Sequence, residues 1–319
     1  MKPSPKTAYR DICRHAAQAT LFHQPWWLDA ACGPGNWQVA IARNENTGEV
    51  EGALPYHVRS RFGVKIVAPP PLTPFLGPLL CPPEGLNHYK LRAFEEALAA
   101  QLLSELPRLP AVRLKLHYDV HNWLPFRQVG FRQTTRYSYR ILDLSDIEAV
   151  WASFHPKLRN KINHAARFCQ VQQIDDAGPV FQLFERRFQQ KGQAAPIHRE
   201  WFAGVDQALM QRQARAAFLC SDRAGRPLAG AYIAWDQYSS YLLLTGFDEQ
   251  ANIRGAAALA VWASIQFVAE RGLIYDFEGS MLPGVERFFR EFGGELCSYH
   301  RLAKYRNRMW EVLFHTIRK

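Results

Sequence analysis

Acidic side chains at the end of a predicted strand are the first candidates for chemistry in this 319-residue chain. In YDFEGSMLPGVERFFREFGGELCSYH, Asp276 and Glu278 follow the strand-like run LIY and precede a stretch with helical spacing. Active sites of α/β folds gather at the carboxyl ends of strands, and a carboxylate there can act as a general base. Either carboxylate could accept a proton from an attacking ammonium. The alternative is structural, with both carboxylates paired to Arg287 or Arg290.

A turn between a predicted strand and a predicted helix is the second candidate. In LLLTGFDEQANIRGAAALAVWASI the strand ends near Phe247 and the helix starts near Asn252. The first turn of a helix has unpaired N–H groups and a partial positive charge, and small residues let a phosphate approach closely. An ordinary strand-to-helix connection, with alanines chosen for helix propensity, is the alternative. The residues predicted to bind a phosphate-bearing donor are Asn252, Arg254, Gly255 and Ala257.

Positive charge is concentrated in HPKLRNKINHAARF, since no acidic residue lies between Glu148 and Asp175. On a helix, Lys157, Lys161 and His164 share one face. A solvated helix face is the default explanation. A uniformly basic helix, joined by the basic tail HRLAKYRNRMW, also suits a polyphosphate or an RNA backbone. The residues assigned to such a contact are Lys157, Arg159, Lys161 and Lys304.

Composition and length limit the class of protein. The net charge of +10 would attract nucleic acid, an anionic lipid surface or a phosphorylated small molecule, and the alternative is a protein that is basic without any such partner. No apolar run approaches the roughly 18 residues of a membrane span, and the N-terminal stretch lacks the apolar centre of a signal peptide, so we expect a cytoplasmic protein. The six cysteines are scattered, without the spacing of a zinc site or a redox pair, so we expect no metal and no redox cofactor.

The elements that must position these residues alternate between strand and helix patterns. Residues 37–58 indicate a hairpin, and the proline-rich residues 69–83 indicate an irregular loop packed over the core. Residues 215–248 alternate like three strands joined by turns, and an alanine-rich helix follows and ends at Gly272. Helices that interrupt a nearly consecutive set of strands predict an α/β (α+β) fold, with helices on both faces of a sheet. The length favours two domains, which we place at 1–140 and 141–319.

Three segments together resemble the Fem-type aminoacyltransferases of the GNAT superfamily, including relatives described as acetyltransferases. LFHQPWWLDA resembles the N-terminal opening of that family, and YRILDLS before HPKLRNKINHAARF resembles its strand and basic helix. The C-terminal signature is matched by Asp276, Phe277, Glu278, Gly284, Phe288, Phe292 and Gly293. The resemblance spans nearly the whole chain. It implies tandem GNAT-like domains, each a mixed central sheet flanked by helices.

The resemblance also implies roles for particular residues. In the GNAT core two neighbouring strands splay apart, and a backbone amide in the gap holds a thioester carbonyl, worth about 3–4 kcal/mol of barrier. The family lysine falls on Phe289, which we therefore place beside the donor. The nearest cation is Arg290, about 100° further round the helix, which can hold an anionic group but not readily carry a proton. Tyr299 and Lys304, on the next strand, could reach the same cavity, and Tyr299 could act there as a general acid. For Lys304 the alternative is a position on the surface.

We therefore expect an acyltransferase that moves an acyl or aminoacyl group to an amine acceptor. The co-substrate is a CoA thioester or an aminoacyl-tRNA, bound in the second domain, and no cofactor is tightly bound. The acceptor is expected to enter from a cleft between the domains. One alternative is an acyl-CoA-specific N-acetyltransferase acting on a small molecule or a lipid precursor. A peripheral contact with anionic lipid precursors is open for either enzyme. Another is a non-catalytic GNAT-like protein that binds RNA or a protein partner.

Overall fold

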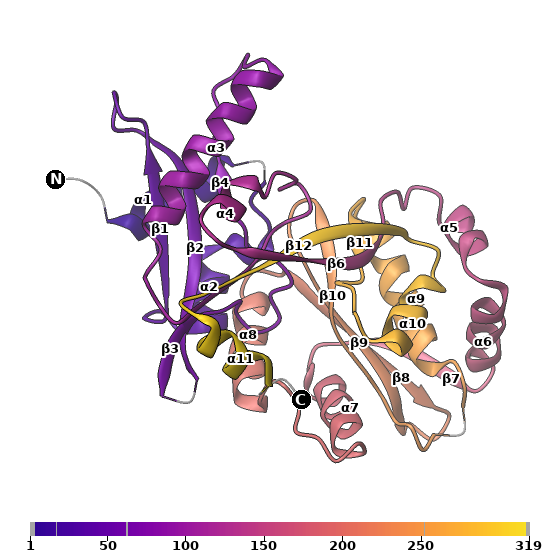
Figure 1. Ribbon diagram of the computed structural model, residues 1–319. Helices are drawn as coiled ribbons and strands as arrows, with labels where there is room; N and C mark the ends of the chain where they lie inside the picture. The colour runs from indigo at the N-terminus through magenta and orange to yellow at the C-terminus, as the bar shows by residue number, and fades with distance from the viewer. Residues whose placement is uncertain (1–3, 17, 62, 252, 317–319) are drawn as a thin grey trace. The chain divides into compact units, whose positions relative to one another are not determined.

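The chain forms two compact units. The computed structural model describes residues 4–16, 18–61, 63–251 and 253–316 (Figure 1). The first unit comprises Met1–Arg136 and Ser298–Lys319, and the second comprises Tyr137–Cys297. The predicted second domain, 141–319, differs from this division in its last segment, which belongs to the first unit. The reason is strand pairing, because β12 (Glu295–Tyr305) pairs antiparallel with β5 (Ala111–Lys115).

The first unit contains a mixed sheet with the strand order β1-β2-β3-β5-β12, and β4 pairs with β2. β3 and β5 are parallel and the other neighbours are antiparallel. The predicted hairpin is confirmed as β1 and β2, whose turn is held by the Asn44 side chain accepting the N–H groups of Asn46 and Thr47. The remaining strands of this unit are β1 (Trp37–Arg43), β2 (Val50–Arg61), β3 (Val64–Val67) and β4 (Leu79–Leu80).

Helices and an irregular loop cover the core of the first unit. The helices are α1 (Pro5–His15), the 3-10 helix η1 (Leu21–His23), α2 (Pro25–Cys32), α3 (His88–Ser104), α4 (Leu124–Gln128) and α11 (Arg308–Thr316). The proline-rich loop packs inward as predicted, because Phe75 is fully buried and lies edge-on against Phe22. Trp27 is also fully buried, and its indole N–H donates to the Thr73 hydroxyl of that loop.

The second unit is built on a mixed sheet with the order β6-β11-β10-β9-β8-β7. β7 to β10 form an antiparallel meander, β10 pairs with β11 in parallel, and β11 pairs antiparallel with β6. β6 belongs to this unit from Tyr137 onwards. The strands are β6 (Arg132–Ile141), β7 (Cys169–Ile174), β8 (Arg215–Asp222), β9 (Pro227–Trp235), β10 (Ser239–Phe247) and β11 (Ile274–Asp276).

Helices cover both faces of this second sheet, as its sequence pattern predicts. Along β9, Ala231 packs into a core cluster with Val261 of α9, whereas the next residue, Tyr232, packs edge-on against Phe202 of α8. Successive strand residues point to opposite faces, so both faces of β9 are buried. The α/β class is therefore confirmed. The helices are α5 (Ile147–Ser153), α6 (Pro156–Ala166), α7 (Gly178–Gln189), α8 (Arg199–Met210), α9 (Ala256–Ala269) and α10 (Pro283–Arg290) (Figure 1).

Candidate active site

Two parallel strands of the second unit pair over three residues only, because β11 ends at Asp276. β10 and β11 pair only from Ser239 opposite Ile274 to Tyr241 opposite Asp276, although β10 continues to Phe247. A β-bulge between Leu242 and Leu244 interrupts the β9 ladder where β11 ends. The rest of β10 thus has no parallel neighbour within the described residues. Such an edge presents backbone N–H groups that can hold a carbonyl oxygen.

A pocket of about 420 Å³ lies on the part of β10 that β11 leaves uncovered. Thr245 and Phe247 of β10 form one side of it, and the first turn of α9 forms another. Val285 and Phe288 of α10 contribute apolar surface, and Leu158 contributes the same from α6. An apolar pocket with a few polar groups at its mouth is the usual form of a small-molecule site.

The N-terminus of α9 opens into this pocket. Gly255, its N-cap residue, has a φ of 100° and supplies no side-chain cap, and the first turn contains no acidic residue. A Cβ at this position would lie 2.2 Å from the Lys161 carbonyl oxygen, so the close approach of α6 to this turn requires glycine. Arg254 and Ala257 also line the pocket, whereas Asn252 lies outside the described residues. The turn thus offers unpaired N–H groups to an anion.

Three cationic side chains converge on the same pocket. They are Lys161 from α6, Arg187 from α7 and Arg254 from the turn before α9. Lys161 Nζ lies 3.3 Å from a carboxylate oxygen of Glu291, and the Arg187 guanidinium lies 4.9 Å from the centre of the Phe247 ring. Arg254 is exposed.

Two acidic residues also line the mouth of the pocket, and each has a cation beside it. Asp248 lies 3.6 Å from Arg186, and Glu249 lies 3.5 Å from Lys191. These neighbours offset the two carboxylates, so the pocket keeps a positive field suited to phosphate.

Asp276 is fully buried and surrounded by donors. The Ser138 hydroxyl donates to it at 2.7 Å, and the backbone N–H of Glu278 donates at 2.7 Å. Arg140 Nε lies 3.5 Å from its other oxygen. The alternative prediction, an ion pair of Asp276 with Arg287 or Arg290, therefore named the wrong arginine. The actual partner comes from β6, because Arg140 is directly opposite Asp276 across the β6–β11 ladder.

Glu278 is half-buried and has a left-handed backbone, with a φ of 58°. Gly279 follows with a φ of 57°, and a Cβ there would lie 2.0 Å from the Tyr137 carbonyl oxygen. A non-glycine residue in this region of φ/ψ space costs free energy and must be held by its surroundings. The hydrogen bond from its N–H to Asp276 is one such restraint. Glu278 lies two residues beyond Asp276, the last residue of β11.

The predicted residues on α10 lie apart from the pocket. Phe289 is buried against Phe277 and is absent from the pocket lining, whereas the preceding residue, Phe288, lines it. Arg290 is exposed and lies 3.5 Å from Glu286. The Tyr139 hydroxyl donates to Glu286 at 2.6 Å, and burial together with this hydrogen bond raises the pKa of Tyr139. Arg290 thus belongs to a surface ion pair.

Two predicted residues belong to the first unit rather than to the unit that holds the pocket. Tyr299 is buried and lies edge-on against Tyr118, with ring centres 5.6 Å apart. Lys304 is exposed, with its Nζ 5.9 Å from the centre of the Phe131 ring. Both lie on β12 beyond the point where that strand enters the first unit.

The basic helix is α6, and one of its three assigned cations lines the pocket. Lys161 does so, whereas Lys157 and Arg159 do not. Lys157 is exposed and Arg159 is half-buried. The positive surface of α6 therefore extends beyond the pocket.

Sequence reasoning missed the pocket residues Arg187 and Phe288 and the Asp276 partners Ser138 and Arg140. Arg187 lies in α7, more than 60 residues before the α9 turn, and no local pattern links the two. Ser138 and Arg140 reach Asp276 through the pairing of β6 with β11, strands that are far apart in the sequence. Of these four residues, only Phe288 belonged to a motif recognised in the sequence, the one that covers α10.

Within the described residues, no helix is both long and apolar enough to cross a membrane. Among the same residues, no group of three or more His, Cys, Asp or Glu side chains could hold a metal ion.

Comparison with known proteins finds a family match within the second unit and a similar fold over nearly the whole chain. Residues 152–290 match the family model for the GNAT acetyltransferase domain. No curated protein sequence matches the chain. The matched segment includes β10, α9 and α10, so the uncovered part of β10 and the pocket described above lie inside it.

Solved structures extend the likeness to nearly the full length. FemX is 13% identical, with 94% of this chain and 96% of that chain covered and a TM-score of 0.64. A tandem GNAT protein from the clavulanic acid biosynthesis pathway is 11% identical, with 95% of each chain covered and a TM-score of 0.55. L-PGS from Bacillus licheniformis is 12% identical, with 99% and 96% covered and a TM-score of 0.54. The predicted resemblance to Fem-type and tandem GNAT proteins is therefore confirmed at the level of the fold.

Proposed function

We propose that this protein is an N-acyltransferase that transfers an acyl group from an activated donor to an amine. The observation that carries the proposal is the pocket of the second unit, which joins an uncovered strand edge to a cationic helix N-terminus. A thioester or ester carbonyl fits the strand edge, and a phosphate group fits the helix N-terminus. The match of residues 152–290 to the GNAT acetyltransferase domain supports the same chemistry.

In the proposed reaction, the amine nitrogen attacks the carbonyl carbon of the donor. Backbone N–H groups of β10 near the Leu242–Leu244 bulge stabilise the negative charge that forms on the oxygen. Glu278 accepts the proton that the amine nitrogen loses. The carbon–sulfur or carbon–oxygen bond of the donor then breaks, the leaving thiolate or alkoxide takes up a proton from solvent, and Glu278 releases to solvent the proton that it accepted. The products are an amide and the free thiol or hydroxyl carrier.

Asp276 has a positioning role in this proposal rather than a chemical one. It is fully buried and accepts hydrogen bonds from Ser138 and from the backbone of Glu278. A carboxylate held in this way stabilises the left-handed turn that presents Glu278. Asp276 and Glu278 were both predicted as candidates for the general base, and this proposal assigns that role to Glu278.

An acyl-CoA is the donor that the pocket supports best. Lys161, Arg187 and Arg254 converge on one compact volume beside the α9 N-terminus, as binding of a pyrophosphate requires. An aminoacyl-tRNA is the second candidate. It is favoured by Lys157 and Arg159, which extend the positive charge along α6 away from the pocket.

Titration of the purified full chain with CoA and with aminoacyl-tRNA, at low and moderate salt, tests the proposal. Arg254→Ala is expected to weaken binding of the true donor about tenfold, since a charge-assisted hydrogen bond contributes about 1.5 kcal/mol. Arg199→Ala is the matched control, because Arg199 is also exposed in the second unit but lies on α8 away from the pocket.

Each outcome of this titration has a definite meaning. Tight binding of CoA that Arg254→Ala weakens supports the acyl-CoA proposal. Salt-dependent binding of tRNA without CoA affinity replaces it with aminoacyl transfer. Binding of neither donor, or equal effects of Arg254→Ala and Arg199→Ala, contradicts the proposed donor site.

A further inference from the structure

An exposed apolar stripe runs along α11 in the first unit. Met309 is 63% exposed, Val312 is 55% exposed and Leu313 is 39% exposed. Their spacing of three and four residues places them on one side of the helix. On the opposite side, Phe314 is buried and stacks on Trp310, with ring centres 6.0 Å apart. Single exposed apolar residues are ordinary on protein surfaces, but a contiguous stripe marks an interaction site.

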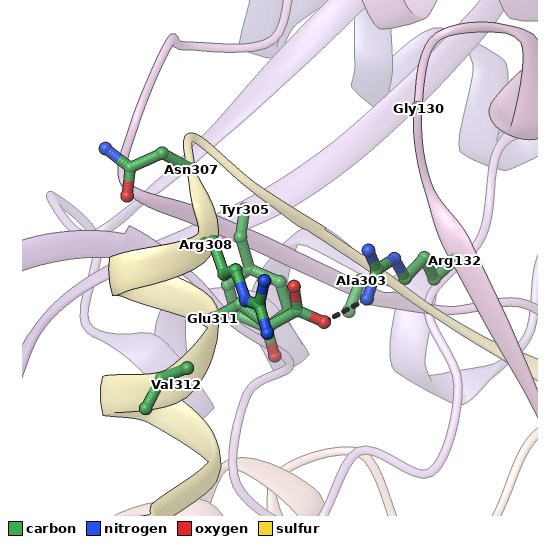
Figure 2. Close-up of a pocket in the computed structure, with 8 residues that line it drawn as sticks. All are labelled: Gly130, Arg132, Ala303, Tyr305, Asn307, Arg308, Glu311 and Val312. Carbon is green, nitrogen blue, oxygen red and sulfur yellow. Dashed lines mark hydrogen bonds and ion pairs between the residues drawn. The ribbon is translucent and has the colours of Figure 1, made fainter.

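A hollow of about 740 Å³ lies beside this stripe, also within the first unit. Figure 2 shows Arg308, Glu311 and Val312 of α11 on one side of it and Arg132 of β6 on the other. Arg132 forms an ion pair with Glu311. Val312 belongs both to the apolar stripe and to the lining of the hollow, so the two features are continuous.

The charged side chains that line the hollow carry a net positive charge, from two arginines and one glutamate. Glu311 is the carboxylate that lines the hollow, and it forms an ion pair with Arg132. Arg308 lines the hollow, is exposed and makes no ion pair with any residue in the described part of the chain. Arg306 and Lys304, close by in sequence, are exposed as well. An apolar stripe with cations along its border is the pattern of a helix that lies at a membrane surface.

We propose that α11 docks this protein on a membrane surface that contains anionic phospholipid. Met309, Val312 and Leu313 enter the boundary between headgroups and acyl chains, and a lipid phosphate lies in the hollow beside Arg308. A second copy of the chain fits this face less well, because two copies would bring the same cations together. A nucleic acid would make no use of the apolar stripe. The proposal is independent of the acyl-transfer site in the second unit.

Co-sedimentation of the full chain with lipid vesicles tests this proposal. The probes are vesicles of phosphatidylcholine alone and vesicles with about one third phosphatidylglycerol. We expect binding only to the second kind, and binding that weakens as salt is raised. Met309→Ser combined with Leu313→Ser is expected to weaken it at least tenfold. Arg308→Ala is expected to weaken it about fivefold, the contribution of one cation near an anionic surface.

Controls separate docking by α11 from general stickiness and from unfolding. Met210→Ser removes an apolar side chain of similar exposure, 53%, from α8 and should leave vesicle binding unchanged. Exchanging the two stripe residues, as Met309→Leu with Leu313→Met, keeps the apolar surface and should retain binding. Thermal unfolding followed by circular dichroism checks that each variant is folded.

Several results would overturn the proposal. They are absence of binding to phosphatidylglycerol vesicles, equal binding to both kinds of vesicle, and full binding by the doubly serine-substituted variant. Sedimentation velocity is a further test. If the unchanged protein is a dimer and the variant with Met309→Ser and Leu313→Ser is a monomer, a second copy covers the stripe instead.

Discussion

At the scale of single residues, two neighbouring carboxylates have different surroundings. Asp276 is fully buried and has donors from β6 and from the backbone. Glu278 is half-buried, lies beyond the paired part of β11, and has a left-handed backbone. The sequence pattern identified both as candidates but could not distinguish them, because the distinction comes from Ser138 and Arg140 on a distant strand. We therefore expect substitutions at the two positions to have different effects.

Replacing Glu278 by glutamine should remove activity without unfolding the protein. A positioned general base contributes about 10²- to 10⁴-fold to a rate, so kcat of Glu278→Gln should fall by about that amount in an acetyl-CoA-dependent assay with an amine acceptor. The melting temperature should change little, because glutamine keeps the size of the side chain. Full turnover by this variant would remove Glu278 from the mechanism.

Replacing Asp276 by asparagine should mainly reduce stability. The change leaves the Arg140 guanidinium, which is 15% exposed, without its buried negative partner, and breaking a buried pair costs about 3 kcal/mol. Urea unfolding monitored by circular dichroism measures the loss. Asp11→Asn is the control, since it removes one half of an exposed pair with Arg14 and should cost less than about 1 kcal/mol. Similar losses for both variants would contradict the structural role of Asp276.

Among the secondary-structure elements, the connection between β10 and α9 brings together the uncovered edge of β10, the N-terminus of α9 and the three cations. Local pattern was sufficient to predict α9, because its alanine-rich sequence and the glycine after it are local signals. It was also sufficient to predict the β1–β2 hairpin. The way α6 packs against the α9 turn could not be predicted, since it depends on the Gly255 and Lys161 backbones meeting in space.

Replacing Gly255 by alanine should disrupt the donor pocket. The new Cβ would lie 2.2 Å from the Lys161 carbonyl oxygen, so the turn or α6 has to move. We expect at least a tenfold loss of donor affinity by calorimetric titration, together with a lower melting temperature. Gly272→Ala is the matched control, because its φ is also positive, at 64°, but no atom lies near the new Cβ. It should cost only about 1–2 kcal/mol of stability and leave donor affinity unchanged.

At the scale of the whole molecule, the return of the C-terminal segment to the first unit was the main departure from the predicted organisation. β12 pairs with β5 nearly 190 residues away, and no periodicity in the sequence records such a pairing. The fold class, by contrast, followed from the alternation of strand and helix patterns and from three motifs spread along the chain. Of the candidate site, the α9 turn was identified in advance, whereas the positions of Phe289, Arg290 and Tyr299 required the structure.

Stability of the first unit should fall in mild acid. Burial lowers the pKa of His23 to about 3, and burial with the nearby charge of Arg59 lowers the pKa of His57 to about 4, each from 6.5. The unfolded chain therefore binds protons below pH 6.5 that the folded chain does not, so stability decreases as the pH falls from about 6.5 towards 4. Two such protons correspond to a loss of up to about 2.7 kcal/mol per pH unit.

Urea unfolding between pH 7 and pH 5 measures this loss. His57→Gln removes one of the two sites of proton uptake and should lower the pH dependence by about half. An unchanged pH dependence in His57→Gln would show that His57 does not contribute to acid sensitivity.

Acyl transfer as proposed requires the second unit to bind an acyl donor between the uncovered edge of β10 and the N-terminus of α9. Amide hydrogen exchange of the full chain, with and without saturating acetyl-CoA or aminoacyl-tRNA, tests it most directly. We predict that one of the two donors increases protection in residues 242–247 and 254–260, while the first unit changes little. Protection confined to other segments, or no change with either donor, would show that the donor does not bind at this place.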